Sequence, residues 1–373
     1  MLAHRRIIVT GGAGFIGSHL VKALVEAENH VFVIDNLWRG TLDNLKRSDG
    51  SFVIDPHSDL CIADLTDYAT CLEWIKNADY VYHLADVVAG IDYVFSHESY
   101  VFHQNVLINT NTLAACLSNN IPNYIYVGTA CSFPKHLQMA SGVARLVEAQ
   151  TYPAEPESAY GWSKLMGEYE AELASRHGRI NVGLLRLHNV YGPGADYTST
   201  RSQVIPALCR KAIAHPEEDF VVWGSGNQYR DFVYVDDIVQ ALLLVAEVGM
   251  NQGVIQIGSE IPVTIRELAE KVIAVSGKAI ELKFDTSRPE GDRGRVAVCD
   301  RARSILDWQP EWGLGEGIAA TFAWVSAQMQ HRVAREPASG LPPTRGGNRP
   351  LGYPAVQARS RGTSATGSLS SVP

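Results

Sequence analysis

Tyr160 and Lys164 are the first residues that suggest chemistry, because four positions separate them in a segment with the pattern of a helix. That spacing places both side chains on one face, one turn apart. An ammonium beside a phenol stabilises the phenolate and lowers the pKa of the tyrosine, so Tyr160 is suited to exchanging a proton with a substrate hydroxyl. Thr129 follows an apolar run and offers a second hydroxyl to the same oxygen. Together the three residues predict an acid/base site.

A glycine-rich turn is predicted between the first strand and the first helix. Gly11, Gly14 and Gly17 have the spacing G-x-x-G-x-x-G, after the apolar run 6–10 and before the helical pattern 15–27. Gly11 permits a tight turn, Gly14 lets the backbone approach a phosphate, and Gly17 lets the helix pack closely on the sheet. Backbone amides and the helix dipole at such a turn suit a pyrophosphate.

Asp35 ends the second predicted strand, 31–35, where its carboxylate can accept hydrogen bonds from an adenosine ribose. The same charge repels a 2′-phosphate, so the expected cofactor is NAD rather than NADP. The other residues expected to contact the cofactor adjoin the turn or the strand ends: Phe15, Ile16, Asn36, Asp64 and Leu65. A further strand end, 83–86, fits either an approach to the cofactor or plain packing.

Alternating strands and helices must position these residues. The runs 80–84, 124–127 and 182–187 predict buried strands, and 105–118 and 160–176 predict helices between them. Such alternation is typical of an α/β fold with a Rossmann-type, doubly wound parallel sheet.

Downstream of Arg186 the chain becomes rich in glycine, proline and aromatic residues, as in loops over a cleft. Further helices are predicted at 236–248, 265–275 and 299–308. We therefore predict an NAD-binding domain over 1–187, with a return segment near 229–257, and a smaller substrate-binding lobe mainly over 188–330. The segment 331–373 is rich in Arg, Pro, Gly and Ser, which predicts an inert, disordered tail rather than one that contacts an acidic surface.

Composition excludes several classes of protein. Hydrophobic residues make up 46% and charged residues 19% of the chain, as in ordinary globular proteins. A net charge of −8 argues against nucleic acid as a partner. No apolar run of about 20 residues predicts a membrane span, and no signal-peptide layout is evident, so a cytoplasmic location is expected. The six cysteines lack metal-ligand spacing, so they predict buried thiols and no metal site, with Cys131 as the candidate exception.

The glycine turn, Thr129, the Tyr160/Lys164 pair and the segment 186–193 together resemble the extended short-chain dehydrogenase/reductase family. The resemblance covers residues 5 to about 330. It implies tightly held NAD, a nucleotide-diphosphate sugar as substrate, and a homodimer. It also implies that these residues contact the substrate: Asn189, Gln203, Lys211, Arg230 and Arg293. Arginine binds a diphosphate well through paired hydrogen bonds, although each arginine also fits a solvated surface charge.

Within the family, the segments 128–134, 152–156, 208–212 and 290–295 are most similar to the GDP-mannose 3,5-epimerases. In that branch Cys131 falls on a catalytic cysteine, whose thiolate can remove a proton from C3 or C5 beside a 4-keto group. A small buried thiol is the alternative interpretation. The acid lysine of the branch is replaced by Gln203, which cannot donate a proton in that role. Lys135, a bound water or inversion at a single carbon remain open alternatives.

The sequence thus predicts an NAD-dependent nucleotide-sugar epimerase that acts through a transient 4-keto sugar. Dehydration is disfavoured because Ala130 and Cys131 stand where dehydratases carry an Asp-Glu pair. A UDP-sugar 4-epimerase, which needs no additional base, is the main alternative. A non-catalytic, NAD-binding regulator is the alternative from another class.

Overall fold

The computed structural model describes residues 2–139, 142–198, 202–288 and 293–335. The first compact unit of the chain ends at His331. Helix α11 (Leu314–Arg335) continues a few residues farther, so the segment predicted to be disordered begins as a helix. The remainder of that segment lies outside the described residues.

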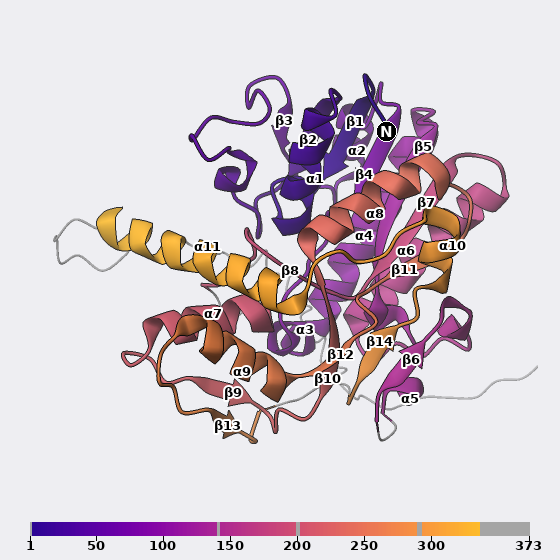
Figure 1. Cartoon of the computed structure of the whole chain (residues 1–373). Coiled ribbons are helices and arrows are strands. Elements are labelled where there is room, and N and C mark those ends of the chain that lie inside the picture. The colour runs from indigo at the N-terminus through magenta and orange to yellow at the C-terminus, as the bar shows by residue number, and fades with distance from the viewer. Residues whose placement is uncertain (1, 140–141, 199–201, 289–292, 336–373) are drawn as a thin grey trace, which may run out of the picture. The chain divides into compact units, whose positions relative to one another are not determined.

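Seven parallel strands form the central sheet, in the order β11-β7-β5-β4-β1-β2-β3. Their bounds are β1 Arg6–Thr10, β2 His30–Asp35, β3 Leu60–Ile62, β4 Tyr80–His83, β5 Asn123–Thr129, β7 Asn181–Leu187 and β11 Val254–Ile257. The strand order reverses between β1 and β4, where doubly wound sheets bind their ligands. This arrangement confirms the predicted Rossmann-type fold (Figure 1).

Alternate side chains of each strand feed two separate cores. Val9 and Val33 belong to the core on one face of the sheet, whereas their neighbours Ile8 and Ile34 belong to the core on the other. Successive side chains of a strand point to opposite faces, so an uninterrupted apolar run buries both. The five strands expected from the sequence are therefore found in the sheet.

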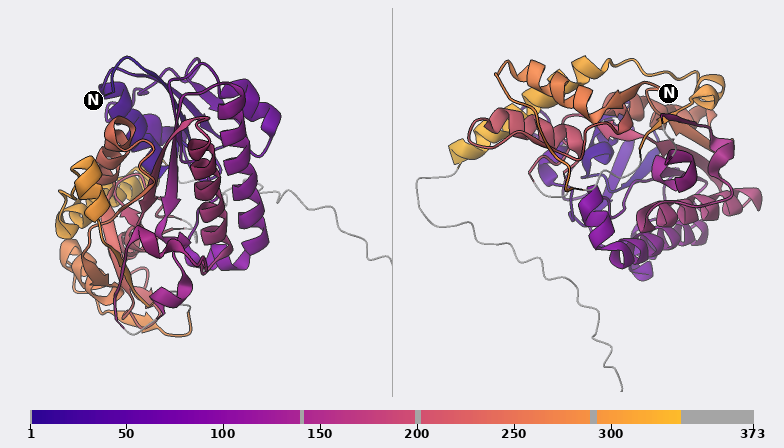
Figure 2. Two further views of the ribbon diagram at one scale, coloured as in Figure 1. Left: turned by 90° about the vertical axis from the view of Figure 1, so that its right-hand side faces the viewer. Right: turned by 90° about the horizontal axis from the view of Figure 1, so that it is seen from below.

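Helices cover both faces. Helices α1 (Phe15–Glu26) and α8 (Val235–Val248) pack on the first core. Helices α2 (Tyr68–Trp74), α4 (Glu98–Ser118) and α6 (Ala159–Arg176) pack on the second. Figure 2 shows the long α4 and α6, purple and magenta, on the side of the sheet opposite α8. Helices α1, α4, α6 and α8 bury apolar residues three or four positions apart, the spacing that puts them on one face.

Small sheets of two or three strands, with the helices that pack on them, form a smaller lobe at the carboxyl ends of the strands. Strand β10 (Tyr229–Tyr234) pairs in parallel with β8 (Asn189–Tyr191) and antiparallel with β12 (Pro262–Thr264). Two further parallel pairs join β9 to β13 and β6 to β14. The bounds of the other elements are α3 Ile91–Ser96, α5 Lys135–Gln138, β6 Ala144–Leu146, α7 Val204–Ala214, β9 Val221–Trp223, α9 Ile265–Ser276, β13 Lys283–Asp285, β14 Arg295–Ala297 and α10 Asp300–Leu306, with short 3-10 helices η1 Leu42–Leu45, η2 Ala130–Ser132 and η3 Glu148–Thr151.

Helix α11 supports the loop that follows β8. A Cβ atom on Gly317 would lie 2.3 Å from the Tyr191 hydroxyl, so the helix approaches the strand as closely as a glycine allows. Farther along the helix, Trp324 packs edge-on against Tyr197, with ring centroids 5.7 Å apart. The loop is thereby packed from its outer side. Among the described helices, none is both long and apolar enough to cross a membrane.

Candidate active site

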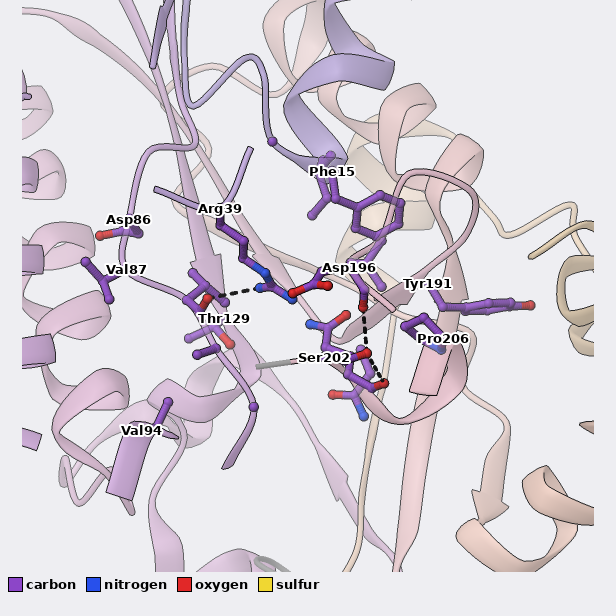
Figure 3. Close-up of a pocket in the computed structure, with 18 of the residues that line it drawn as sticks. Phe15, Arg39, Asp86, Val87, Val94, Thr129, Tyr191, Asp196, Ser202 and Pro206 are labelled. Atoms are coloured by element: carbon purple, nitrogen blue, oxygen red, sulfur yellow. Dashed lines mark hydrogen bonds between the residues drawn. The ribbon is translucent and has the colours of Figure 1, made fainter. Parts of the chain in front are cut away.

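A cavity of about 970 Å³ lies where the carboxyl ends of the central strands face the lobe. Its lining includes almost every site residue predicted from the sequence: Gly11, Gly14, Phe15, Ile16, Gly17, Asp35, Asn36, Asp64, Leu65, Thr129, Cys131, Tyr160, Lys164, Asn189, Gln203, Lys211 and Arg230. In Figure 3, Arg39 reaches into the cavity from the segment after β2, and Asp196 reaches into it from the loop after β8. Arg293 is the predicted residue that the lining lacks.

The glycine turn leaves no room for side chains. Gly11 has φ of +69°, and a Cβ there would lie 2.8 Å from the backbone nitrogen of Ala85. A Cβ on Gly17 would lie 2.2 Å from the carbonyl oxygen of Gly11. Gly14 is the N-cap of α1, and no side chain caps that helix. The first amides of α1 have no partner within the helix, so this turn fits the pyrophosphate of a dinucleotide.

Asp35 braces the turn and also faces the cavity. Its carboxylate accepts hydrogen bonds from the backbone nitrogens of Ala13, at 3.0 Å, and Leu37, at 2.8 Å. Burial raises the pKa of Asp35 above its ordinary value, against the effect of these donors. Carboxylate oxygens have several lone pairs, so ribose hydroxyls can still be accepted. The structure therefore suits the role predicted for Asp35.

Tyr160, Thr129 and Lys164 come together at the cavity wall. Helix α6 begins at Ser158, whose hydroxyl caps the amide of Gly161 at 3.2 Å. The nearby Thr129 hydroxyl favours the phenolate and acts to lower the pKa of Tyr160. Burial nevertheless raises the pKa of Tyr160 well above its ordinary value, and negative charge on Cys131 and Asp86 adds to the rise.

The expected lowering of the Tyr160 pKa by Lys164 is therefore wrong for the protein by itself. The Lys164 ammonium forms a buried ion pair with Asp86 and lies 4.5 Å from the centroid of the Tyr126 ring. Burial and the neighbouring negative charges therefore outweigh any stabilisation of the Tyr160 phenolate by this ammonium. Sequence reasoning treated Asp86 only as part of a strand end.

Asp86 is almost entirely buried, and its second oxygen, Oδ1, has no hydrogen-bond partner in the described part of the chain. Nearby His83 is fully buried between Thr10, at 2.8 Å, and Asn109, at 2.9 Å. Burial and the positive charge of Lys164 lower the pKa of His83 to about 3, so its ring stays neutral. Asp86 and the hydrogen-bonded His83 thus place buried polar groups beside the Tyr160/Lys164 pair.

Cys131 lies in η2, directly after the Thr129 strand, and is half-buried, whereas the other five cysteines are buried. A Cβ on Gly161 would lie 2.3 Å from the Cys131 carbonyl oxygen, so α6 starts in close contact with η2. This contact holds Cys131 and Tyr160 on the same wall. The Cys131 Sγ accepts a hydrogen bond from Nη2 of Arg295 at 3.2 Å.

Arg295, rather than Arg293, belongs to the cavity. Arg293 precedes β14 and is exposed, which matches the solvated-charge interpretation. Arg295 begins β14 and is 7% exposed, and its Nη1 donates to Oε1 of Gln138 at 2.6 Å. The sequence predicts Arg293 as a substrate contact, whereas the structure places Arg295 in the cavity lining.

Amide and basic groups lie among the apolar, hydroxyl and acidic side chains of the lobe wall. Lys211 donates from Nζ to the Val221 carbonyl oxygen at 2.6 Å, and burial lowers its pKa. Arg230 donates to the Tyr229 carbonyl oxygen at 2.7 Å. Gln203 is the N-cap of α7. Lys135 is exposed and lies outside the cavity lining, so it is poorly placed to replace the acid that Gln203 lacks.

In the described ranges, no group of three or more His, Cys, Asp or Glu side chains is placed to hold a metal ion. The chemistry that these residues support by themselves is proton transfer beside a dinucleotide site.

Comparison with known proteins gives consistent results. Residues 7–258 match the NAD dependent epimerase/dehydratase family. The chain is 30% identical to GDP-mannose 3,5-epimerase of Arabidopsis thaliana over 330 residues, which cover 88% of this chain and 84% of that protein.

Two solved structures extend the comparison to the fold. UDP-glucose 4-epimerase of Thermotoga maritima, solved with UDP-glucose, has a TM-score of 0.77 and 26% identity, covering 87% of this chain and 99% of its own. UDP-glucose 4-epimerase of Thermus thermophilus, solved with NAD, has a TM-score of 0.72 and 26% identity, covering 86% and 98% respectively.

Proposed function

The chain belongs to the NAD-dependent epimerase/dehydratase family, and on that premise we propose that it inverts a nucleotide sugar through a transient 4-keto form, as a GDP-mannose 3,5-epimerase does. Its cofactor is NAD, as the sequence predicts. The observation that carries the proposal is that two proton-transfer groups, Tyr160 and Cys131, share one wall of the cavity. Oxidation at C4 needs only the first group, so the second implies proton exchange at a neighbouring carbon.

When bound, NAD supplies an acceptor and donor of hydride. Tyr160 takes the proton from the C4 hydroxyl and later returns it, and Thr129 orients the same oxygen. The ketone acidifies the protons on C3 and C5. Cys131 removes one of them, and the carbon is reprotonated from the opposite face.

The lobe supports recognition of a nucleotide diphosphate. Lys211 and Arg230 bring positive charge to the cavity, and Asn189 and Gln203 bring amide groups. Guanidinium and ammonium groups bind phosphate oxygens well. GDP-mannose is the first substrate to test because the similar Arabidopsis thaliana enzyme is named for it.

The test is incubation of the purified enzyme with GDP-, UDP- and dTDP-sugars in deuterated water, followed by NMR of the sugar. We expect deuterium at C5 or C3 of an inverted sugar. Cys131→Ala should abolish this label and turnover together. Cys61→Ala, which changes a thiol outside the cavity lining, is the matched control and should leave both intact.

A UDP-sugar 4-epimerase is the second candidate, favoured by the similarity to UDP-glucose 4-epimerases and by Gln203 in place of an acid. In that reaction the ketone rotates and hydride returns to the other face of C4. Inversion without deuterium, unaffected by Cys131→Ala, would establish this candidate and exclude the first.

We also propose that the enzyme is a homodimer. Helix α6 presents Trp162, Met166 and Tyr169 to solvent, with exposed fractions of 39%, 46% and 47%. These residues lie on one helical face, beside a small hollow shared with α4. Light scattering should give twice the monomer mass, and Met166→Glu should reduce it to that of the monomer.

A further inference from the structure

Arg295 is the charged side chain that the structure brings to the Cys131 sulfur. The two residues are 164 positions apart, and the contact joins β14 of the lobe to the end of β5 in the sheet. A guanidinium is protonated at any ordinary pH, so it delivers a permanent positive charge. Nη2 of this guanidinium donates a hydrogen bond directly to Sγ of Cys131, at 3.2 Å.

The guanidinium is held in place from its other side. Its Nη1 donates to Oε1 of Gln138, and Nε2 of Gln138 donates to the carbonyl oxygens of Phe133, at 3.1 Å, and Pro134, at 3.3 Å. Gln138 is only 1% exposed and therefore has little freedom. This chain of hydrogen bonds returns to the segment that carries Cys131, so the sulfur and the guanidinium are positioned as one unit.

The electrostatic surroundings show why such a unit matters. The cavity lining also contains these charged or titratable side chains: Asp35, Arg39, Asp64, Asp86, Glu157, Tyr160, Lys164, His188, Tyr191, Asp196, Arg210, Lys211, Glu218 and Arg230. Negative charge on Cys131 raises the pKa of Tyr160. A thiolate on Cys131 therefore disfavours a phenolate on Tyr160. Lys164 is already paired with Asp86, and the His188 ring is kept neutral by burial, which lowers its pKa.

We propose that Arg295 is a positioning residue that holds the Cys131 sulfur and stabilises its negative charge when Cys131 acts as the base, while Tyr160 stays protonated. This inference rests on the proposed function, and it assigns the order in which the two groups lose their protons. In the proton-transfer step, the carbon–hydrogen bond at C5 or C3 breaks and a sulfur–hydrogen bond forms. The electron pair moves into the enolate of the 4-ketone. Arg295 stabilises the sulfur before the step and releases it once it is neutral.

The test measures the thiol itself in the NAD-loaded enzyme. Alkylation of Cys131 by iodoacetamide is followed by mass spectrometry from pH 5 to 10, because only the thiolate reacts. We expect Arg295→Gln to move the midpoint upward by about one pH unit or more, with a tenfold loss of reactivity at pH values below both midpoints. Arg295→Lys should restore part of the shift, since it returns the charge without the fork that also holds Gln138.

Arg293→Gln is the matched control: it removes a neighbouring exposed arginine and should leave the midpoint unchanged. Should Arg295→Gln fail to fold, Arg295→Met retains the aliphatic stem and carries the same expectation. A folded neutral variant with an unchanged midpoint overturns the proposal. So does an increase in KM for the sugar nucleotide with no change in the thiol profile, because that result assigns Arg295 to substrate binding alone.

The readout separates this proposal from the proposed function. Alkylation requires no substrate, so the midpoints can be compared even if no tested nucleotide sugar is inverted. A shifted midpoint without sugar exchange would retain the thiolate assignment and reject the epimerase reaction.

Discussion

The two walls of the cavity are built in different ways. The cofactor wall consists of short segments at the ends of parallel strands, such as residues 11–17 and 35–36. Each segment directly follows the strand that positions it. The lobe wall gathers Asn189, Gln203 and Arg295 from segments that lie as much as a hundred positions apart. Parallel strands bring the segments at their carboxyl ends to one edge of the sheet. The residues of the lobe wall, by contrast, come together only when segments distant in the sequence pack against one another.

The walls also use positive charge differently. On the cofactor side, Lys164 is neutralised by a buried carboxylate. On the lobe side, Arg295 donates to a thiol and an amide. We therefore expect substitutions on the cofactor wall to affect stability and the shared C4 chemistry, and substitutions on the lobe wall to change which carbon is exchanged.

The largest expected effect is that of Tyr160→Phe. Removing the hydroxyl eliminates the acid/base group for C4, and kcat should fall about 10³-fold while NAD stays bound. Steady-state kinetics and the NAD content of the purified variant check this. Tyr68→Phe, at an exposed tyrosine of α2, is the control and should retain normal turnover. A Tyr160→Phe enzyme with undiminished turnover would assign the C4 proton to another group.

Asp86→Asn comes next. It leaves the Lys164 ammonium buried without its counter-charge, which should lower the free energy of unfolding by about 3 kcal/mol. Urea denaturation measures the loss. Asp43→Asn breaks an exposed ion pair with Lys46 instead, and should cost less than about 1 kcal/mol. Equal losses at the two positions would mean that burial of the cofactor-wall pair has no energetic importance.

His83 predicts a pH effect of intermediate size. Its pKa is about 3 in the folded protein, below the ordinary 6.5, so between these values the unfolded chain binds a proton that the folded chain does not. Stability therefore increases with pH across this window and falls by about 1.4 kcal/mol per unit as the pH drops below 6.5. At about pH 5 the loss is about 2 kcal/mol. Unfolding measured from about pH 5 to 7 should show a shallower slope for His83→Gln, and parallel slopes would contradict the assignment.

The smallest effect is expected at Gln203, on the lobe wall. Gln203→Lys introduces an ammonium at the rim of the cavity, where it can protonate a carbon that Cys131 has deprotonated. We expect deuterium to appear at a second carbon with a gain of about tenfold or less, because the new ammonium stands on a flexible four-carbon side chain. The charge at the start of α7 should cost about 0.5 kcal/mol of stability. An unchanged labelling pattern would show that the acid comes from elsewhere.

The fold was accessible to sequence reasoning because its signals are local. The apolar runs of β1, β4, β5 and β7 are short, rich in β-branched residues, Leu and Tyr, and bounded by turns, and all of them lie in the sheet as predicted. The glycine turn was predictable for the same reason, since its geometry is set by seven consecutive residues. Helix α11 extends past residue 330, the predicted end of the lobe, because the change of composition that marks the tail begins inside the helix.

The contacts that tune the site were not accessible in this way. The pair of Lys164 and Asp86 spans 78 positions, and it depends on β4 lying next to β5 in the sheet. The choice between Arg293 and Arg295 depends on where β14 starts its pairing with β6, which the repeated Arg-Gly-Arg pattern does not reveal. The raised pKa of Tyr160 likewise follows from burial and from charges that the fold brings together.

One carboxylate, that of Asp35, accepts hydrogen bonds from the backbone amides of Ala13 and Leu37, and these bonds matter for any redesign of coenzyme preference. A common route to accepting a phosphorylated dinucleotide is to replace such an acid with a small neutral residue. In this enzyme the replacement would remove an acceptor from two backbone amides as well as the repulsion of the phosphate. The coenzyme preference and the conformation of the glycine turn would change together. A successful redesign must therefore give those two amides another hydrogen-bond acceptor.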